Sequence, residues 1–246
     1  MDILIPSWFK GSEIFIDFFS FIVLSIFFIL SLKYYKLCKK KNFLYLGIGF
    51  LLIAVAQLAS IFTKFVLYYD TSFTQNIGQM VITYRVVKSV DIFYYAGFFF
   101  QKLLTLLGFY LIYRLPLKKK FSGDFMLALY FIILSALVSI TSTYFFHITV
   151  LILLIFITIN YYNVYRENKN INTKILIFGF IILIIGEILF SVTNPQSIAF
   201  IFANIIELIG YSVLLVLIIR ILYCKHCDTI KNSAKARKGR NGQKKR

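Results

Sequence analysis

The chain has 246 residues, of which 60% are hydrophobic and only 15% are charged, and its formal net charge is +17. Soluble proteins average about 45–50% apolar and about 25% charged residues, so this composition excludes a soluble globular enzyme. An aromatic content of 19% excludes a disordered chain, and three cysteines exclude a disulfide scaffold. A polytopic membrane protein remains.

Seven apolar runs are long enough to cross a bilayer, because a helix needs about 20 residues to span about 30 Å of hydrocarbon. The runs are continuous rather than alternating, which predicts an all-α protein and not a barrel. The fourth and fifth are so close that they predict a tight helical hairpin. The alternative is six spans, with one hydrophobic stretch entering and leaving without crossing. The predicted spans are about 14–32, 43–67, 92–113, 125–142, 145–165, 175–192 and 198–223.

The orientation is predicted from Lys and Arg, which accumulate in cytoplasmic loops. The loops after the first, third and fifth runs hold five, four and three of them, and the segment from Arg220 onward holds ten, so 22 of the 27 lie on one side. This predicts a multi-pass protein of the cell membrane with its N-terminus outside and its C-terminus cytoplasmic. The acidic start Met1-Asp2 and the bulky pair Tyr34-Tyr35 indicate that the first run is a retained span rather than a cleaved signal peptide.

Two segments outside the predicted spans have a distinct composition. Residues 68–91 form the longest loop between spans and are polar, so we expect them to cap the outer side. Residues 224–246 have no hydrophobic period, which predicts a basic disordered cytoplasmic tail bound to anionic lipids of the inner leaflet. An acidic protein partner or RNA is the alternative, with no sign of a specific nucleic-acid site. The lipid-binding cations are Lys231, Lys235, Arg237, Lys238, Arg240, Lys244, Lys245 and Arg246.

Three cysteines should lie at the cytoplasmic face. Cys224 and Cys227 have Cys-x-x-Cys spacing beside His226, and Cys38 lies in the first inner loop. Such a set allows a metal site. Reduced or lipidated juxtamembrane thiols are the favoured interpretation, because the spacing is cramped. No cofactor is expected.

The two halves of the chain share a pattern. Gly49-Phe50-Leu51-Leu52 resembles Gly179-Phe180-Ile181-Ile182, and Leu107-Gly108-Phe109 resembles Ile209-Gly210-Tyr211. This suggests that spans one to three are duplicated as five to seven, with span four as a linker (3+1+3). Chance similarity of apolar helices is the alternative. The pair of glycines at 47 and 49 indicates close helix packing.

The 3+1+3 layout is similar to those of microbial rhodopsins and SWEET sugar transporters, but the residues do not fit either. The last span has no Lys to hold retinal, and Pro6, Pro116 and Pro195 all lie outside the spans. The chain resembles, more generally, uncharacterised prokaryotic multi-helix membrane proteins in which a Lys-rich loop leads into a Gly-Phe-Leu-Leu-type helix. That resemblance implies no activity.

Ionisable residues inside a span are costly and therefore mark candidate sites. Lys102 and Glu207 share a depth in the third and seventh spans, which predicts an ion pair between them. We expect a polar ligand or ion pocket that opens outward, with an ion pair that only fixes helix packing as the alternative. Asp17 and Lys64 lie near the outer edge, where long side chains reach water, and His147 has no predicted partner. The pocket residues are Lys102, Glu207, Glu187, Gln57, Gln101 and Asn204.

No phosphate-binding loop, catalytic triad or metal-ligand spacing is evident in the spans, so no enzyme is predicted. Asn160 is expected to make an interhelical hydrogen bond. Three functions remain. The first is a receptor-like or sensory seven-helix protein, the second is a small-solute transporter built on the 3+1+3 repeat, and the third is a purely structural membrane protein.

Overall fold

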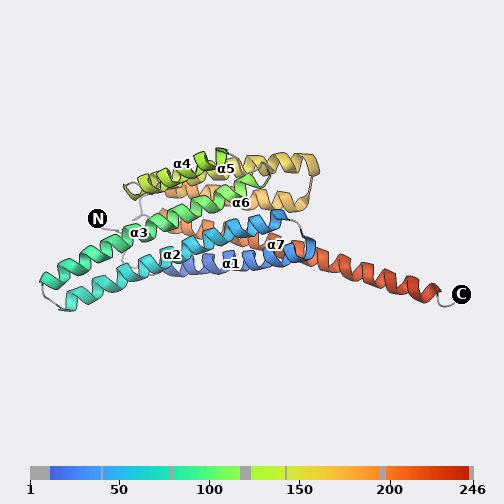
Figure 1. Cartoon of the computed structure of the whole chain (residues 1–246), viewed down its shortest axis with the longest axis horizontal. Coiled ribbons are helices and arrows are strands. Elements are labelled where there is room, and N and C mark those ends of the chain that lie inside the picture. The colour runs from blue at the N-terminus through green and yellow to red at the C-terminus, as the bar shows by residue number, and fades with distance from the viewer. Residues whose placement is uncertain are drawn as a thin grey trace.

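The computed structural model describes the backbone of residues 12–39, 41–77, 80–116, 123–141, 143–193 and 198–243. Side chains are described for 14–37, 39, 41–66, 93–116, 126–139, 143–193, 199–221 and 223. This part of the chain folds into seven α-helices, shown in Figure 1. They are α1 (Ser12–Cys38), α2 (Lys41–Ile77), α3 (Met80–Arg114), α4 (Gly123–Thr141), α5 (Thr143–Asn168), α6 (Ile171–Val192) and α7 (Ile198–Gln243).

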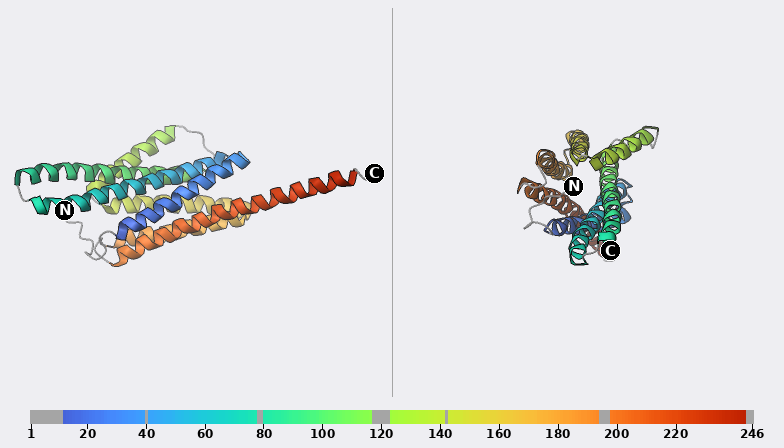
Figure 2. Two further views of the ribbon diagram at one scale, coloured as in Figure 1. Left: turned by 90° about the horizontal axis from the view of Figure 1, so that it is seen from below. Right: turned by 90° about the vertical axis from the view of Figure 1, so that its left-hand side faces the viewer.

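The helices confirm the prediction of an all-α multi-pass membrane protein. Six of them, all except α4, are long and apolar enough to cross a membrane. Helix α4 has a shorter apolar segment, Met126–Ser139, and is inclined to its neighbours at the periphery (Figure 2). Large apolar side chains such as Phe15, Phe62 and Phe202 are exposed on the outside of the bundle, where lipid takes the place of water.

Two segments differ from the sequence prediction because helices continue past the apolar runs. Most of 68–91, predicted as a loop, is helical, since α2 runs to Ile77 and α3 begins at Met80. Helix α7 likewise continues to Gln243, where a disordered tail was predicted. The two extensions project from opposite ends of the bundle, which we call the hairpin end (α2–α3) and the tail end (α7), as Figure 1 shows.

The helices form a closed ring. Helix α1 packs against α2 and α7, α2 packs against α3, α3 against α5, α5 against α6, and α6 against α7. Helix α4 lies outside this ring, against α3 and α5. Within the described ranges, α3 and α7 make no contact with each other, because α1 and α2 separate them on one side and α5 and α6 on the other. The ring order therefore decides which polar side chains meet.

Paired glycines bring neighbouring helices close in both halves. A Cβ atom on Gly108 would lie 2.7 Å from the carbonyl oxygen of Gly49 and 2.6 Å from Ile53. In the second half, a Cβ on Gly179 would lie 2.5 Å from Leu214, and one on Gly210 would lie 2.6 Å from Leu183. The predicted close packing at Gly49 is confirmed.

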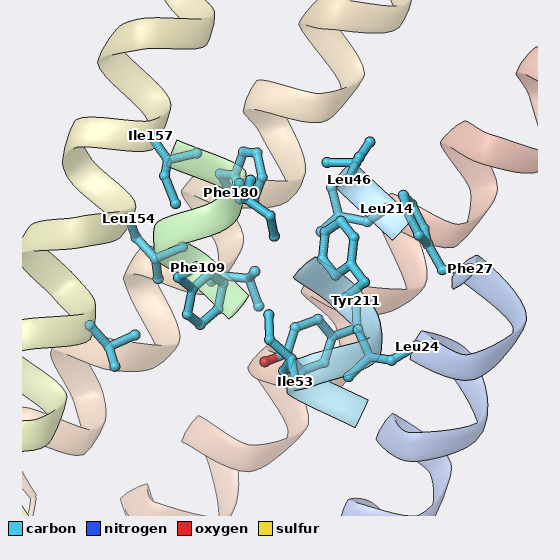
Figure 3. Packing of buried hydrophobic residues seen from close by; sticks show 14 of the residues in the cluster. Leu24, Phe27, Leu46, Ile53, Phe109, Leu154, Ile157, Phe180, Tyr211 and Leu214 are labelled. Carbon is cyan, nitrogen blue, oxygen red and sulfur yellow. The ribbon is translucent and has the colours of Figure 1, made fainter. Parts of the chain in front are cut away.

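The interior of the ring is apolar at the level halfway along the helices. Phe27 and Phe50 pack with ring centroids 4.3 Å apart. Tyr211, Phe109 and Phe180 belong to the same cluster of buried residues (Figure 3). Contacts of this kind between helices replace the hydrophobic effect, which is weak inside a bilayer, as the source of packing stability.

Candidate functional site

Polar side chains gather inside the ring toward the hairpin end. The set, which we call the polar layer, comes from α1, α2, α5, α6 and α7. Each member lies near the hairpin-end terminus of its span or within about three turns of it. Five of its members carry an ionisable carboxyl, imidazole or amino group. The polar layer consists of Asp17, Gln57, Lys64, His147, Glu187, Asn204, Glu207 and Tyr211.

Asp17 and Lys64 form an ion pair between α1 and α2. Lys64 Nζ lies 2.7 Å from Asp17 Oδ2, and the hydroxyl of Ser60 donates to the same oxygen at 3.1 Å. Asp17 is only 7% exposed, so it does not reach water in the way expected of a residue at the membrane edge. The pair was missed because depth along a helix does not reveal which way a side chain faces.

His147 and Glu187 form a second pair, between α5 and α6. His147 Nδ1 and Glu187 Oε2 lie 2.9 Å apart and share a hydrogen bond. The imidazole also stacks on Phe190 with ring centroids 4.9 Å apart. Sequence reasoning found no partner for His147, although Glu187 was recognised as a buried acid. Only the contact between α5 and α6 brings the two together.

Glu207 lies on the inward face of α7. Its Oε1 accepts a hydrogen bond from Tyr211 Oη at 2.8 Å, one turn toward the tail end. Asn204 lies on the same face one turn toward the hairpin end, and its Nδ2 donates to the carbonyl oxygen of Phe200. Asn204 and Tyr211 are buried. Glu207 itself keeps part of its surface accessible.

The α6 and α7 parts of the polar layer lie next to each other at Gly186. A Cβ on Gly186 would lie 3.6 Å from the backbone nitrogen of Glu207. Glu187, Asp17 and Lys64 all lie within electrostatic range of Glu207. The layer therefore joins two hydrogen-bonded acid–base pairs to a third carboxyl group, Glu207, which is bound to Tyr211.

The predicted Lys102–Glu207 ion pair is wrong. Lys102 Nζ donates instead to the carbonyl oxygen of Ser139 at 2.5 Å and lies over the ring of Phe146, 5.9 Å from its centroid. Ser139 is in the last turn of α4, where carbonyl groups lack a helical partner and the helix dipole favours a cation. Lys102 thus caps α4. Equal depth placed Lys102 and Glu207 at one level, but α3 and α7 are not neighbours.

Of the six predicted pocket residues, the structure brings Glu187, Glu207 and Asn204 together on α6 and α7, and Gln57 is buried on the inward face of α2. Gln101 is half-buried on α3, and within the described side chains no hydrogen bond joins it to α6 or α7. Gln101, like Lys102, therefore lies outside the polar layer.

Two further predictions concern the tail-end half. Among the described residues Asn160 makes no interhelical hydrogen bond, and its Nδ2 is buried without a partner. The side chains of Cys38, Cys224 and Cys227 and of the basic tail residues lie outside the described part of the chain. The metal site at the cysteines and the binding of the basic tail to lipids stay predictions.

The acids of the polar layer are held in pairs or bound to a tyrosine, and no nucleophile is aligned with a base among the described residues. Such groups can bind a polar or charged ligand within the membrane. Comparison of the chain with protein-family models, with curated proteins and with solved structures gives no match, so its function must be inferred from these residues.

Proposed function

We propose that this membrane protein is a receptor-like or sensory protein in which the polar layer binds a ligand from outside the cell and α7 carries the response to the cytoplasm. The observation that carries the proposal is the course of α7. The same helix holds Asn204, Glu207 and Tyr211 in the polar layer and continues without a break to Gln243.

The length of α7 supports this role. Its membrane span ends at Ile221, so the helix extends 22 residues further, about 33 Å at 1.5 Å per residue. A rigid element that has one end in a ligand site and the other beyond the membrane can transmit a small displacement over its whole length. In the proposed orientation, the hairpin end faces outward and the tail end faces the cytoplasm, in agreement with the distribution of Lys and Arg.

Hydrogen exchange in lipid nanodiscs tests the coupling. We expect Glu207→Gln and Tyr211→Phe, which alter the layer, to change the exchange rates of amides 222–243. Ser212→Ala is the matched control, since Ser212 donates only to its own helix, at Leu208. Unchanged rates in both layer variants, together with a lower Tm, would show that the layer serves packing alone.

A small-solute transporter is the second candidate, and a specific feature favours it. The buried residues Ser20, Leu24 and Phe27 of α1 correspond to the buried Val150, Leu154 and Ile157 of α5 at a constant offset of 130 positions.

The same offset relates Gly49 to Gly179, and the residue four positions after each packs against the partner glycine, Ile53 on Gly108 and Leu183 on Gly210. These likenesses support the 3+1+3 duplication, and parallel repeats of this kind occur in transporters. Uptake by sealed proteoliposomes across a broad solute panel would support transport, and its absence would count against it.

A further inference from the structure

The imidazole of His147 is fixed in position by three contacts. Its Nδ1 shares a hydrogen bond with Glu187 Oε2 of α6 at 2.9 Å. The ring also stacks on Phe190 of α6, with an angle of 17° between the two planes. The ring of Phe146 packs against it nearly edge-on, with centroids 5.2 Å apart. His147 belongs to α5, but α6 therefore decides the orientation of its ring.

These contacts leave one ring nitrogen, Nε2, without a hydrogen-bond partner among the described residues. An ionised carboxylate can only accept a hydrogen bond, so the neutral ring carries its hydrogen on Nδ1 and its lone pair on Nε2. A proton from water that binds Nε2 turns the imidazole into an imidazolium ion, and no other bond in the protein changes. Histidine is also the side chain whose charge ordinarily changes between pH 5 and pH 8.

The pair lies where protons from one side of the membrane can reach it. His147 is four residues from the start of α5 at Thr143, and Glu187 is five residues from the end of α6 at Val192. The two side chains keep 15% and 10% of their surface exposed. In the proposed orientation the hairpin end faces outward, so the protons come from outside the cell.

The charges around His147 favour its protonated form. On α6, Glu187 is in direct contact with the ring, and Glu207 of α7 lies within electrostatic range of Glu187. On α3, Lys102 opposes a second positive charge, but it is hydrogen-bonded to α4 and lies over the ring of the residue before His147. The carboxylate in direct contact therefore has the larger effect. The other titratable groups on the described part of α4 and in the first turn of α5 are exposed tyrosines, Tyr130 and Tyr144.

Two contacts connect the pair to α7. Phe190, on which the imidazole stacks, meets the ring of Phe200 in the first turn of α7, with centroids 5.2 Å apart. The carboxylates of Glu187 and Glu207 repel each other, and an imidazolium ion bound to Glu187 cancels much of that repulsion. A change of charge at His147 therefore alters the surroundings of α7 at two positions.

We infer that the signal of this receptor is the proton, which binds Nε2 of His147 when the medium outside the cell becomes acidic. The inference rests on the proposed function and names the ligand of the polar layer. A proton needs a basic atom and contact with water rather than a cavity, and His147 provides both. The neutral pair and the ionic pair then stabilise two positions of α7.

Nitrogen NMR of the chain labelled with ¹⁵N-histidine, in lipid nanodiscs, follows the proton directly. The chain has two histidines, so the spectra are recorded on His226→Gln, in which only His147 remains. From pH 8 to pH 5 we expect the Nε2 signal to move from that of a lone-pair nitrogen to that of a protonated one, while Nδ1 stays protonated. Adding Glu187→Gln, which keeps an acceptor for Nδ1 but no charge, should move this transition to lower pH. An imidazole that keeps one protonation state, or a transition that Glu187→Gln leaves unmoved, would overturn the assignment.

The distance between spin labels at Glu167 on α5 and Ser233 on α7, measured at pH 8 and pH 5, shows whether α7 responds. We expect it to change with pH in the unaltered chain and in His226→Gln. It should stay constant in His147→Gln, whose amide keeps a donor for Glu187 but does not titrate. If His147→Gln does not fold, Glu187→Gln decides the matter, because the response must move to lower pH together with the imidazole. A response that persists in His147→Gln, or none in the unaltered chain, would overturn the inference.

Failure of this inference is distinguishable from failure of the proposed function. If pH leaves α7 unchanged while Glu207→Gln still alters it, the receptor proposal stands with another ligand. If His147 takes up a proton but neither pH nor Glu207→Gln affects α7, the receptor proposal itself fails.

Discussion

Replacing Lys102 by Met and Glu207 by Gln, singly and together, forms a double-mutant cycle that measures how strongly the two residues are coupled. In the structure, Lys102 caps α4 at Ser139 and Glu207 is bound to Tyr211. Since α3 and α7 are not in contact, the two substitutions should be additive within about 0.5 kcal/mol in the free energy of unfolding.

The single substitutions need not be neutral for the cycle to be informative. Lys102→Met loses a charge-assisted hydrogen bond worth about 1.5–3 kcal/mol. It also removes a lysine that costs about 2.5–3.5 kcal/mol at the centre of a membrane helix, so the two effects largely offset each other. The coupling energy does not depend on this balance, because both single-variant effects are subtracted.

Asp17→Asn with Lys64→Met provides a positive control. These side chains are in contact, with Nζ 2.7 Å from Oδ2, and both are largely buried. Their coupling should be about 1–3 kcal/mol. Unfolding by denaturing detergent, followed by circular dichroism, gives the free energies for both cycles. A coupling of about 1 kcal/mol or more between Lys102 and Glu207, equal to that of the control, would refute the assignment of Lys102 to α4.

Four further substitutions test the packing and the polar contacts and are measured by the same unfolding assay. Gly108→Ala should destabilise by about 1–3 kcal/mol, because its Cβ would lie 2.7 Å from a carbonyl oxygen of α2, and a neutral effect would contradict this contact. Gly186→Ala, whose Cβ would have no atom nearer than 3.6 Å, should be neutral or stabilising by up to about 1 kcal/mol, and a clear loss would be evidence against the α6–α7 spacing. Asn160→Leu should stabilise by about 1–2 kcal/mol, as it removes a buried donor without a partner; a loss would reveal a hydrogen bond at that site. His147→Phe should destabilise by about 1–3 kcal/mol, since Glu187 loses its partner, and an unchanged Tm would exclude that pair.

The helices could be predicted from the sequence because the bilayer sets their length and composition. The apolar runs identify the six long spans and α4, and Gly49 correctly indicates close packing. The extensions of α2, α3 and α7 were missed because they are polar, and a helix that leaves the membrane carries no hydrophobic signal. Hydropathy shows where a helix is in lipid and not where it ends.

The site could be predicted only in part, for a geometric reason. Depth follows from counting residues, and it placed Lys102 and Glu207 at one level. The direction of a side chain around the helix does not follow, because helices that are apolar on all faces have no polar face to identify. The order of helices in the ring is equally absent from one sequence. Both are needed to see that His147 meets Glu187 and that Lys102 meets α4.

The measurement that tests the central claim most directly is the distance between spin labels at Glu167, near the end of α5, and at Ser233 in the α7 extension, with the native cysteines replaced by serine. Glu207→Gln changes the polar layer at the other end of α7 without altering the length of that helix. If the layer controls α7, the distance distribution in nanodiscs must shift between the unaltered chain and Glu207→Gln, and remain the same in Ser212→Ala. Identical distributions in all three proteins would contradict the account.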